Sequence, residues 1–362
     1  MKILYVITQF GVGGAEKVVQ DLANSMSELG HDIKIVSLLD IIKLKVDKKV
    51  TIESLKINTR SPISIIRGLL SLKKSIDKFN PDIIHSHCFH ANIFSRIANI
   101  SSTKVLINTA HSHIEASEQL MNLYKYTDFL CNLTTNVSDF STNYFISKGY
   151  TPVNKISTVY NGIDTEKFCL KNYTAFNQFL SDKRTFQLLA VGSFKSAKDY
   201  PTLIQAISIL EKSFNKFELT ILGDGDLRSQ IEDLIKILDL KDKVKLLGNR
   251  DDVADIMRKS DIFVLSSQYE GFGLVVAEAM SCGCRVVATD CGGVREIVNG
   301  FGKLVPVKSP ELLSNAIFSI INEREDYNFL IKQHKHIVDG FSKQNFILEW
   351  ARIYQSLTSS VK

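Results

Sequence analysis

The chain has 362 residues, of which 44% are hydrophobic and 23% are charged, and its formal net charge is +5. These are ordinary globular values, so they exclude a disordered chain, a collagen-like repeat and a coiled coil. The length favours two domains, because single hydrophobic cores stop growing near about 250–300 residues. The excess charge lies in residues 1–160, which carry 18 basic and 13 acidic side chains. The modest total argues against a nucleic-acid binder but leaves room for a local basic face.

Targeting and cysteine patterns favour a cytoplasmic protein. No stretch reaches the ~18 uninterrupted apolar residues of a membrane-spanning helix, and the first apolar run is too short for a signal peptide. Cys282, Cys284 and Cys291 are spaced closely enough to suggest zinc, but no fourth Cys or His lies near them. We interpret the cysteines as packing residues in a reducing compartment.

Short apolar runs alternate with helix-period segments along the chain, which is typical of parallel α/β sheets. A stretch at 160–185 loses this rhythm and is predicted to be a linker. Strands are predicted in the first half at 2–8, 32–39, 50–57, 82–87 and 104–109, with helices at about 14–29, 64–79 and 91–100. The second half is predicted to hold strands at 185–191, 217–222, 244–247, 262–266, 285–289 and 303–306, and a last helix at about 341–358. The pattern predicts two doubly wound domains with a ligand cleft between them.

Two glycine-rich loops allow more than one interpretation. Gly11-Val-Gly13-Gly14 follows the first strand and opens a helix, which suits an anionic ligand, but it lacks the third spaced glycine of a nicotinamide-dinucleotide site. Gly223-Asp224-Gly225-Asp226 follows another strand. Its two carboxylates suit either a divalent ion with a diphosphate or, as we favour, a strand-to-helix turn.

The richest segment is 266–280, where a strand ends, a Gly-x-Gly loop turns and a helix begins near Leu274. Free backbone N–H groups at 272–275 suit a phosphate or sugar oxygen. Glu270 lies in the loop, and Glu278 lies one turn into an apolar helix. Because an unpaired buried carboxylate is costly, Glu278 requires partners, which are either ligand hydroxyls or a neighbouring helix N-terminus.

The spacing of Glu270 and Glu278 within Ser-x-x-Glu-Gly-Phe-Gly-Leu-x-x-x-Glu-Ala-Met resembles the signature of glycosyltransferase family 4. Supporting pieces are Gly13-Gly-Ala-Glu16, Pro81-Asp-Ile-Ile-His-Ser-His87, Tyr160-Asn-Gly-Ile-Asp164, Leu222-Gly-Asp-Gly225, Val287-Ala-Thr289 and Gly292-Gly293. The resemblance covers nearly the whole chain. It implies a retaining enzyme of GT-B fold with two Rossmann-like domains, namely an acceptor-binding domain at 1–165 and a donor-binding domain at 183–340. The segment 341–362 is implied to be a helix that returns to the N-terminal domain.

The resemblance also implies roles for individual residues. It assigns His111, Lys198 and Glu270 to the reacting centre, with Lys198 on the donor diphosphate and Glu278 on the donor ribose. The implied donor-binding set is Gly13, Gly14, Gly192, Ser193, Lys195, Lys198, Arg250, Val253, Glu270, Gly271, Phe272, Gly273, Leu274 and Glu278. The segment Gly248–Val253 is expected to contact the base.

One position departs from the family pattern, because Ser193 stands where an arginine usually follows Gly192. Lys195 either substitutes for that arginine or is a solvated loop lysine. No cofactor and no metal are expected, because Lys198 and backbone amides neutralise the leaving diphosphate. The histidines at 85, 87, 90, 111 and 113 allow a three-histidine metal site, although a cleft edge suits them without metal.

The expected reaction is transfer of a hexose or N-acetylhexosamine from a nucleotide-diphosphate sugar, expected to be UDP-linked, to a glycan or lipid-linked acceptor of a bacterial surface polysaccharide. Residues 41–80 hold ten basic and three acidic side chains. They either contact an anionic membrane at the inner face of the plasma membrane or form an ordinary solvated helix face. A sugar-nucleotide epimerase, and a nucleotide-sugar-binding partner subunit without turnover, stay open as alternatives.

Overall fold

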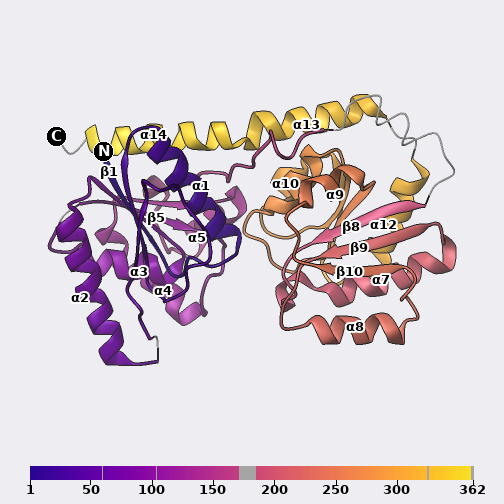
Figure 1. The fold of residues 1–362 in the computed structure, drawn as a ribbon, viewed down its shortest axis with the longest axis horizontal. Coiled ribbons are helices and arrows are strands. Elements are labelled where there is room, and N and C mark those ends of the chain that lie inside the picture. The colour runs from indigo at the N-terminus through magenta and orange to yellow at the C-terminus, as the bar shows by residue number, and fades with distance from the viewer. Residues whose placement is uncertain (59, 103, 171–184, 324–325, 360–362) are drawn as a thin grey trace. The chain divides into compact units, whose positions relative to one another are not determined.

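A computed structural model describes residues 1–58, 60–102, 104–170, 185–323 and 326–359 (Figure 1). The chain divides into two compact units. Unit 1 comprises Met1–Gly162 together with Gln344–Lys362, and unit 2 comprises Ile163–Lys343. Most of the predicted linker, residues 171–184, lies outside the described residues.

Unit 1 is built on a parallel sheet with the strand order β3-β2-β1-β4-β5-β6-β7 in its described part. The strands are β1 (Lys2–Ile7), β2 (Asp32–Ser37), β3 (Thr51–Ser54), β4 (Ile83–His87), β5 (Val105–Ala110), β6 (Leu133–Asn136) and β7 (Ile156–Thr158). The α-helices of its described part are α1 (Gly14–Glu28), α2 (Pro62–Phe79), α3 (Phe89–Ala98), α4 (Glu118–Thr127), α5 (Asp139–Ser147) and α14 (Lys343–Ser359).

The apolar pattern of unit 1 explains why its central strands are buried on both faces. Residues 3–7 of β1 are at most 1% exposed, as a strand covered by helices on both sides requires. α1 buries Val18, Leu22 and Met26 at helical spacing, so one face packs on the sheet. α2 begins after Ser61, whose hydroxyl accepts from the backbone N–H of Ser64, with proline at the first helical position.

Unit 2 repeats the design with the strand order β10-β9-β8-β11-β12-β13 among its described residues. The strands are β8 (Phe186–Val191), β9 (Phe217–Leu222), β10 (Val244–Gly248), β11 (Ile262–Leu265), β12 (Arg285–Thr289) and β13 (Gly302–Val305). The α-helices of its described part are α7 (Tyr200–Ser213), α8 (Arg228–Ile237), α9 (Val253–Lys259), α10 (Leu274–Ser281), α11 (Val294–Val298), α12 (Pro310–Asn322) and α13 (Tyr327–Phe341). Two doubly wound parallel sheets confirm the predicted fold class.

Between residues 110 and 160 the structure contains elements that the sequence pattern did not predict, namely α4, β6, α5 and β7. β6 reads Leu-Thr-Thr-Asn and is nevertheless buried. Its threonine hydroxyls have partners on both faces of the sheet, because Thr134 accepts from Arg96 and Thr135 bonds the Thr109 hydroxyl. Hydrogen bonds therefore take the place of the hydrophobic pattern that usually identifies a buried strand.

Helix α14 packs on the sheet of unit 1, where it runs past β1 (yellow and indigo in Figure 1). Its Tyr354 hydroxyl lies 3.2 Å from the Tyr5 hydroxyl and 2.7 Å from His85 Nδ1. The Trp350 ring packs on His85 with centroids 4.3 Å apart. The last helix thus joins the fold of unit 1 through buried polar and aromatic contacts. Among the described residues no helix has the length and apolarity needed to cross a membrane.

Candidate functional site

Both sheets reverse their strand order at one point, and that is where an open α/β sheet binds ligands. In unit 2 the reversal lies between β8 and β11, so the loops after these strands are the candidate site. The two loops are tied together, because Gln268 N–H donates to the Ala197 carbonyl and the Ser266 hydroxyl donates to the Lys198 carbonyl. A small pocket beside them is lined by Lys198, Tyr200, Ser266 and Ser267, with residues of β8 and β11.

Lys198 and Glu270 form an ion pair at this point, with Nζ 2.6 Å from Oε1. Their side chains are 22% and 11% exposed, so water screens the pair only partly. The Ser267 hydroxyl also donates to Glu270 Oε1, at 2.7 Å. The two charged residues, which are 72 residues apart in the sequence, therefore lie together at the carboxyl end of the sheet.

The loop after Glu270 presents backbone to the site. α10 begins at Leu274 after Gly273, whose φ of 101° is in the left-handed region that favours glycine. Gly271 and Leu274 are half-buried, whereas Phe272 is buried and its ring packs on Phe341. The first turn of α10 follows this loop directly, and a helix N-terminus is a favourable place for an anion.

Close backbone packing explains the other glycines of the site. A Cβ on Gly292, at φ 55°, would overlap the carbonyl of Glu270, and one on Gly223, at φ 136°, would overlap the carbonyl of Gly192. Phe194 N–H donates to the Asp224 carbonyl at 2.9 Å, so the loops after β8 and β9 interlock. These glycines allow the loops to approach one another closely.

The remaining predicted residues of unit 2 lie along the same edge of the sheet. Glu278 is half-buried, one turn into α10. Ser193 and Lys195 are exposed in the loop after β8. Arg250 is exposed in the loop after β10 and forms an ion pair with Asp252, and Val253 is the first residue of α9. Their donor-binding roles stay predictions.

Asp224 and the cysteines have partners other than a metal. Asp224 pairs with Arg228 at 3.5 Å and accepts the N–H of Gly225, which fits the turn interpretation of this loop. Cys282 and Cys284 are buried, and the Cys284 thiol donates to the Met257 carbonyl at 3.1 Å. Within the described ranges no three His, Cys, Asp or Glu side chains are grouped so that they could hold a metal ion.

In unit 1 the strand order reverses between β1 and β4, and the first glycine loop follows β1. Gly13 and Gly14 are exposed at the start of α1. Glu16 is folded back over them, because Gln9 Nε2 donates to its Oε1 at 3.1 Å and a Cβ on Gly13 would overlap its carboxylate. The sequence named Glu16 only as part of a motif, and the structure places its carboxylate against the glycine loop.

His111 follows β5 and is half-buried beside two histidines of β4. Its Nε2 lies 3.0 Å from His87 Nδ1, and the rings of His87 and His85 are 4.1 Å apart. Burial lowers the pKa of His111 to about 4, so the ring is neutral at pH 7. The structure thus brings three of the predicted histidines together as neutral groups.

Glu115 holds the backbone of His111 and was not identified from the sequence. Its Oε1 accepts the N–H of His111 at 2.8 Å, and its Oε2 accepts the Tyr124 hydroxyl at 2.8 Å. Burial raises the pKa of Glu115 to about 7. No sequence signal marked it, because a glutamate in a loop normally indicates a solvated side chain.

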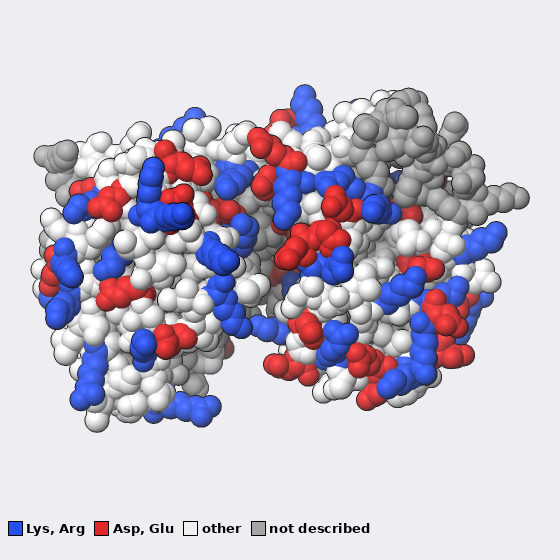
Figure 2. All heavy atoms as spheres, in the orientation of Figure 1, with Lys and Arg blue, Asp and Glu red and all other residues white. Residues whose placement is uncertain are grey.

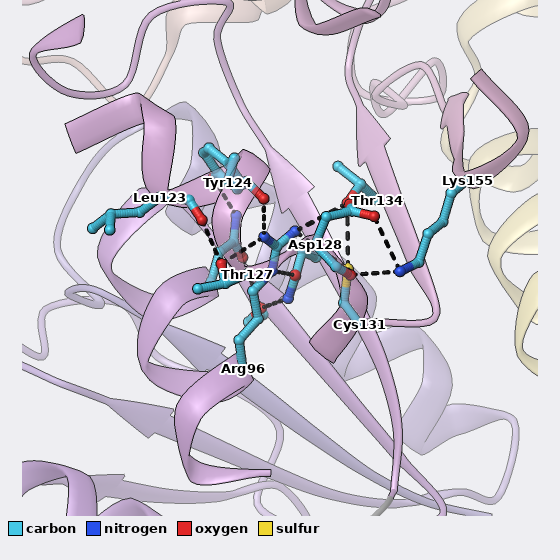
Figure 3. A network of polar contacts seen from close by, with 11 residues as sticks. Arg96, Leu123, Tyr124, Thr127, Asp128, Cys131, Thr134 and Lys155 are labelled. Atoms are coloured by element: carbon cyan, nitrogen blue, oxygen red, sulfur yellow. Dashed lines mark hydrogen bonds and ion pairs between the residues drawn. The ribbon is translucent and has the colours of Figure 1, made fainter. Parts of the chain in front are cut away.

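A buried arginine supports the same loop from below. Arg96 is fully buried on α3 and donates to Asn108 Oδ1 and to the Tyr124 carbonyl, at 2.6 and 2.8 Å. Figure 3 shows Arg96 together with Tyr124 and Asp128. Nη2 of Arg96 lies 3.9 Å from Asp128 Oδ1, and Asp128 in turn pairs with Lys155 at 3.1 Å. The network fixes β5 and α4, and therefore the loop between them that carries His111.

Comparison with known proteins gives matches in both halves of the chain. Residues 12–167 match the family model described as Glycosyltransferase Family 4, and residues 172–337 match the one described as Glycosyl transferases group 1. The boundary between the two matches falls in the segment where the sequence loses its α/β rhythm.

Similar proteins span the chain at low identity. The N-acetyl-alpha-D-glucosaminyl L-malate synthase of Bacillus anthracis is 26% identical, over 98% of this chain and 97% of its own. The UDP-Gal:alpha-D-GlcNAc-diphosphoundecaprenol alpha-1,3-galactosyltransferase of Escherichia coli is 28% identical, over 78% and 77%. The crystal structure of Anabaena HepE in complex with UDP superposes with a TM-score of 0.82 at 20% identity, covering 98% of this chain and 100% of that one. This last likeness concerns the fold alone.

Proposed function

The chain belongs to glycosyltransferase family 4 and is a glycosyltransferase of GT-B fold, and on that premise we propose its donor, stereochemistry and acceptor. We propose that it transfers a hexose or N-acetylhexosamine from a UDP-linked donor to a lipid-linked or glycan acceptor, with retention at the anomeric carbon. The observation that carries the proposal is the ion pair of Lys198 and Glu270 beside the N-terminus of α10.

This arrangement suits a leaving diphosphate. As the bond from the anomeric carbon to the diphosphate oxygen breaks, negative charge develops on the diphosphate and positive charge on the sugar ring. The Lys198 ammonium and the N–H groups at the start of α10 stabilise the first charge. Glu270, released from its pair with Lys198, accepts hydrogen bonds from sugar hydroxyls, and Glu278 takes the ribose hydroxyls. No group has to act as a protein nucleophile.

In the proposed step the acceptor hydroxyl attacks the anomeric carbon from the face that the diphosphate leaves. Its oxygen forms the new glycosidic bond, and its proton passes to a leaving phosphate oxygen, so that UDP and the glycoside are the products. We propose that no metal is required, because Lys198 and the amides carry the charge neutralisation. Activity that EDTA abolishes and Mg²⁺ restores would overturn this part.

Names of relatives support the choice of donor and acceptor. UDP-Gal and a diphosphoundecaprenol-linked GlcNAc stand in the name of the Escherichia coli relative, and UDP is bound in the Anabaena structure. We therefore propose cytoplasmic synthesis of a lipid-linked unit of a surface polysaccharide. The Bacillus anthracis relative takes L-malate by its name, so L-malate belongs in the acceptor panel as a competing outcome.

We also propose that α2 contacts an anionic membrane that carries the acceptor. Ile63, Ile66 and Leu70 are 64%, 59% and 65% exposed, at the spacing that aligns them on one face of the helix. Exposed Arg67 and Lys74 lie beside them on the same face, whereas the opposite face is buried. Figure 2 shows basic side chains on unit 1 where α2 lies in Figure 1. Basic residues near an anionic surface contribute about 1 kcal/mol each.

Vesicle co-sedimentation tests this surface. The wild-type chain is expected to bind vesicles with anionic lipid and to leave zwitterionic vesicles alone. R67E/K74E is expected to lose most of that binding and I66S/L70S part of it, whereas K241E, at an exposed lysine of unit 2, keeps it. Equal binding by R67E/K74E and K241E would reject the surface without affecting the proposed reaction.

The reaction is tested with a panel of nucleotide sugars. A donor present at a concentration of 100 times its Kd raises the free energy of unfolding by roughly 2.7 kcal/mol, so a thermal-shift screen identifies it. We expect UDP release that depends on both donor and acceptor. We also expect an α-linked product from an α-linked donor. An interconverted sugar nucleotide would favour the epimerase, and binding without UDP release would favour a partner subunit.

A further inference from the structure

The ring of His111 contacts a second histidine whose own hydrogen bonding is incomplete. His87 is fully buried, and its Nδ1 lies 3.0 Å from Nε2 of His111. Its other nitrogen, Nε2, is buried and has no hydrogen-bond partner among the residues that the structure describes. Which nitrogen of His87 carries the proton therefore decides whether a donor or an acceptor is left unpartnered.

The ring of His87 packs against the rings of Tyr5, His85 and His111. His85 lies against it with ring centroids 4.1 Å apart, and His85 is itself held by the Tyr354 and Thr109 hydroxyls, both at 2.7 Å. The Trp350 ring also packs on the ring of His85. The Nε1–H of Trp350 is likewise without a hydrogen-bond partner in the described part of the chain. That group is a donor and provides no acceptor for a proton on His87.

Two arrangements of the neutral pair are available. If His111 Nε2–H donates to His87 Nδ1, the proton of His87 is on its buried Nε2 and lacks an acceptor. If His87 Nδ1–H donates to His111 Nε2, the buried Nε2 of His87 is a bare lone pair. Orphaned buried N–H groups are rare in proteins, so the second arrangement is favoured. Burial also lowers the pKa of both rings, which keeps them neutral at pH 7.

We propose that His87 is a positioning residue that fixes the tautomer of His111, so that His111 presents Nδ1–H as a hydrogen-bond donor to a substrate oxygen. The ligand chemistry that fits is a sugar hydroxyl or another neutral oxygen acceptor. His111 therefore steadies an oxygen and does not remove a proton from the acceptor hydroxyl. The part that concerns the substrate rests on the proposed function, whereas the tautomer is a property of the unliganded protein.

Nitrogen-15 NMR of histidine-labelled full-length protein tests the tautomer directly. Long-range proton–nitrogen spectra distinguish a protonated from a bare ring nitrogen, and H111Q identifies the signals of His111. The expected result is a protonated Nδ1 and a bare Nε2 on His111 in the wild-type protein at about pH 7. A protonated Nε2 would overturn the proposal, whatever the enzyme does with sugar nucleotides.

Variants of His87 test the cause. H87N keeps an amide N–H near the position of Nδ1 and is expected to keep the His111 tautomer. H87L removes the donor, so His111 is expected to become a mixture of its two tautomers. kcat is expected to fall about tenfold or more in H87L, with the Kd for UDP unchanged. H90N, at an exposed histidine of α3, is the matched control, and circular dichroism checks folding of every variant.

The outcomes separate the two proposals. An unchanged His111 tautomer in folded H87L would reject the role of His87 while leaving sugar transfer intact. The expected tautomers together with no transfer from any nucleotide sugar would reject the proposed function and leave the tautomer assignment standing.

Discussion

Replacing Lys198 with alanine is the most direct test of the candidate site. The substitution removes the ammonium that lies 2.6 Å from Glu270 Oε1, in a pair whose side chains are 22% and 11% exposed. Two consequences differ in size and in readout. On the proposed role of Lys198, loss of one positioned donor to the leaving diphosphate is expected to reduce kcat by about 10²–10³, or about 2.7–4 kcal/mol of activation free energy. Loss of the partner of a mostly buried carboxylate lowers the free energy of unfolding by about 1–3 kcal/mol.

The assay follows UDP release at saturating donor and acceptor, alongside calorimetric titration with UDP and chemical denaturation. K212A removes an exposed lysine at the far end of α7 and serves as the matched control, with kcat expected within about twofold of wild type. S193A is expected to have a far smaller effect than K198A. K195A decides the remaining alternative, because a loss of similar size would identify Lys195 as the substitute for the missing arginine.

A second variant separates the two consequences. K198A/E270Q removes the charge that K198A leaves unpaired, so the double variant is expected to recover stability without recovering kcat. Near-wild-type kcat with unchanged UDP affinity in K198A would refute the assignment. Recovery of kcat in the double variant would show that Lys198 acts only by neutralising Glu270.

Three further predictions concern the surroundings of the site. Glu115, whose pKa is raised from 4.5 to about 7, destabilises the folded protein as pH rises from about 5 to 8. The free energy of unfolding of E115Q is therefore expected to rise relative to wild type by on the order of 2 kcal/mol across that interval, as measured by denaturation. A difference that stays constant with pH would contradict the raised pKa. R96M is expected to lower the free energy of unfolding by about 3–5 kcal/mol, because the groups that accept hydrogen bonds from the buried guanidinium are left unpaired. R96K is not expected to recover this stability. A loss below about 1 kcal/mol in R96M would show that the network is dispensable. G292A is expected to displace the Glu270 loop, so UDP-sugar affinity falls more than global stability does, and unchanged affinity would show that the loop yields without cost.

The elements that the sequence predicted well are those whose signal is local. Apolar runs of five or six residues identified most strands of both sheets, because a strand buried on both faces cannot carry polar residues without partners. The start of α10 near Leu274 followed from the Gly-x-Gly turn before it. Where hydrogen bonds replaced apolar burial, as in β6, the same reasoning found nothing.

Residues of the candidate site show a similar division. Glu270 and Lys198 were identified by motif, but their pairing joins loops 72 residues apart in the sequence and could be seen only once β8 and β11 lay side by side. Glu115 and Arg96 had no motif at all. A carboxylate and a guanidinium normally indicate solvent exposure, and only the packing of α3 and α4 shows that both are held inside.

The sequence by itself thus determined the class of fold, the family and the positions of the strands with apolar runs, although not of β6 and β7. Periodicity and turn chemistry act over a few residues and are written directly in the residue types. The tertiary structure decided which polar groups became partners, because parallel strands bring loops from distant segments to one edge of a sheet. His87 and His111 illustrate the physical reason: a hydrogen bond depends on position and burial, and these are properties of the folded chain.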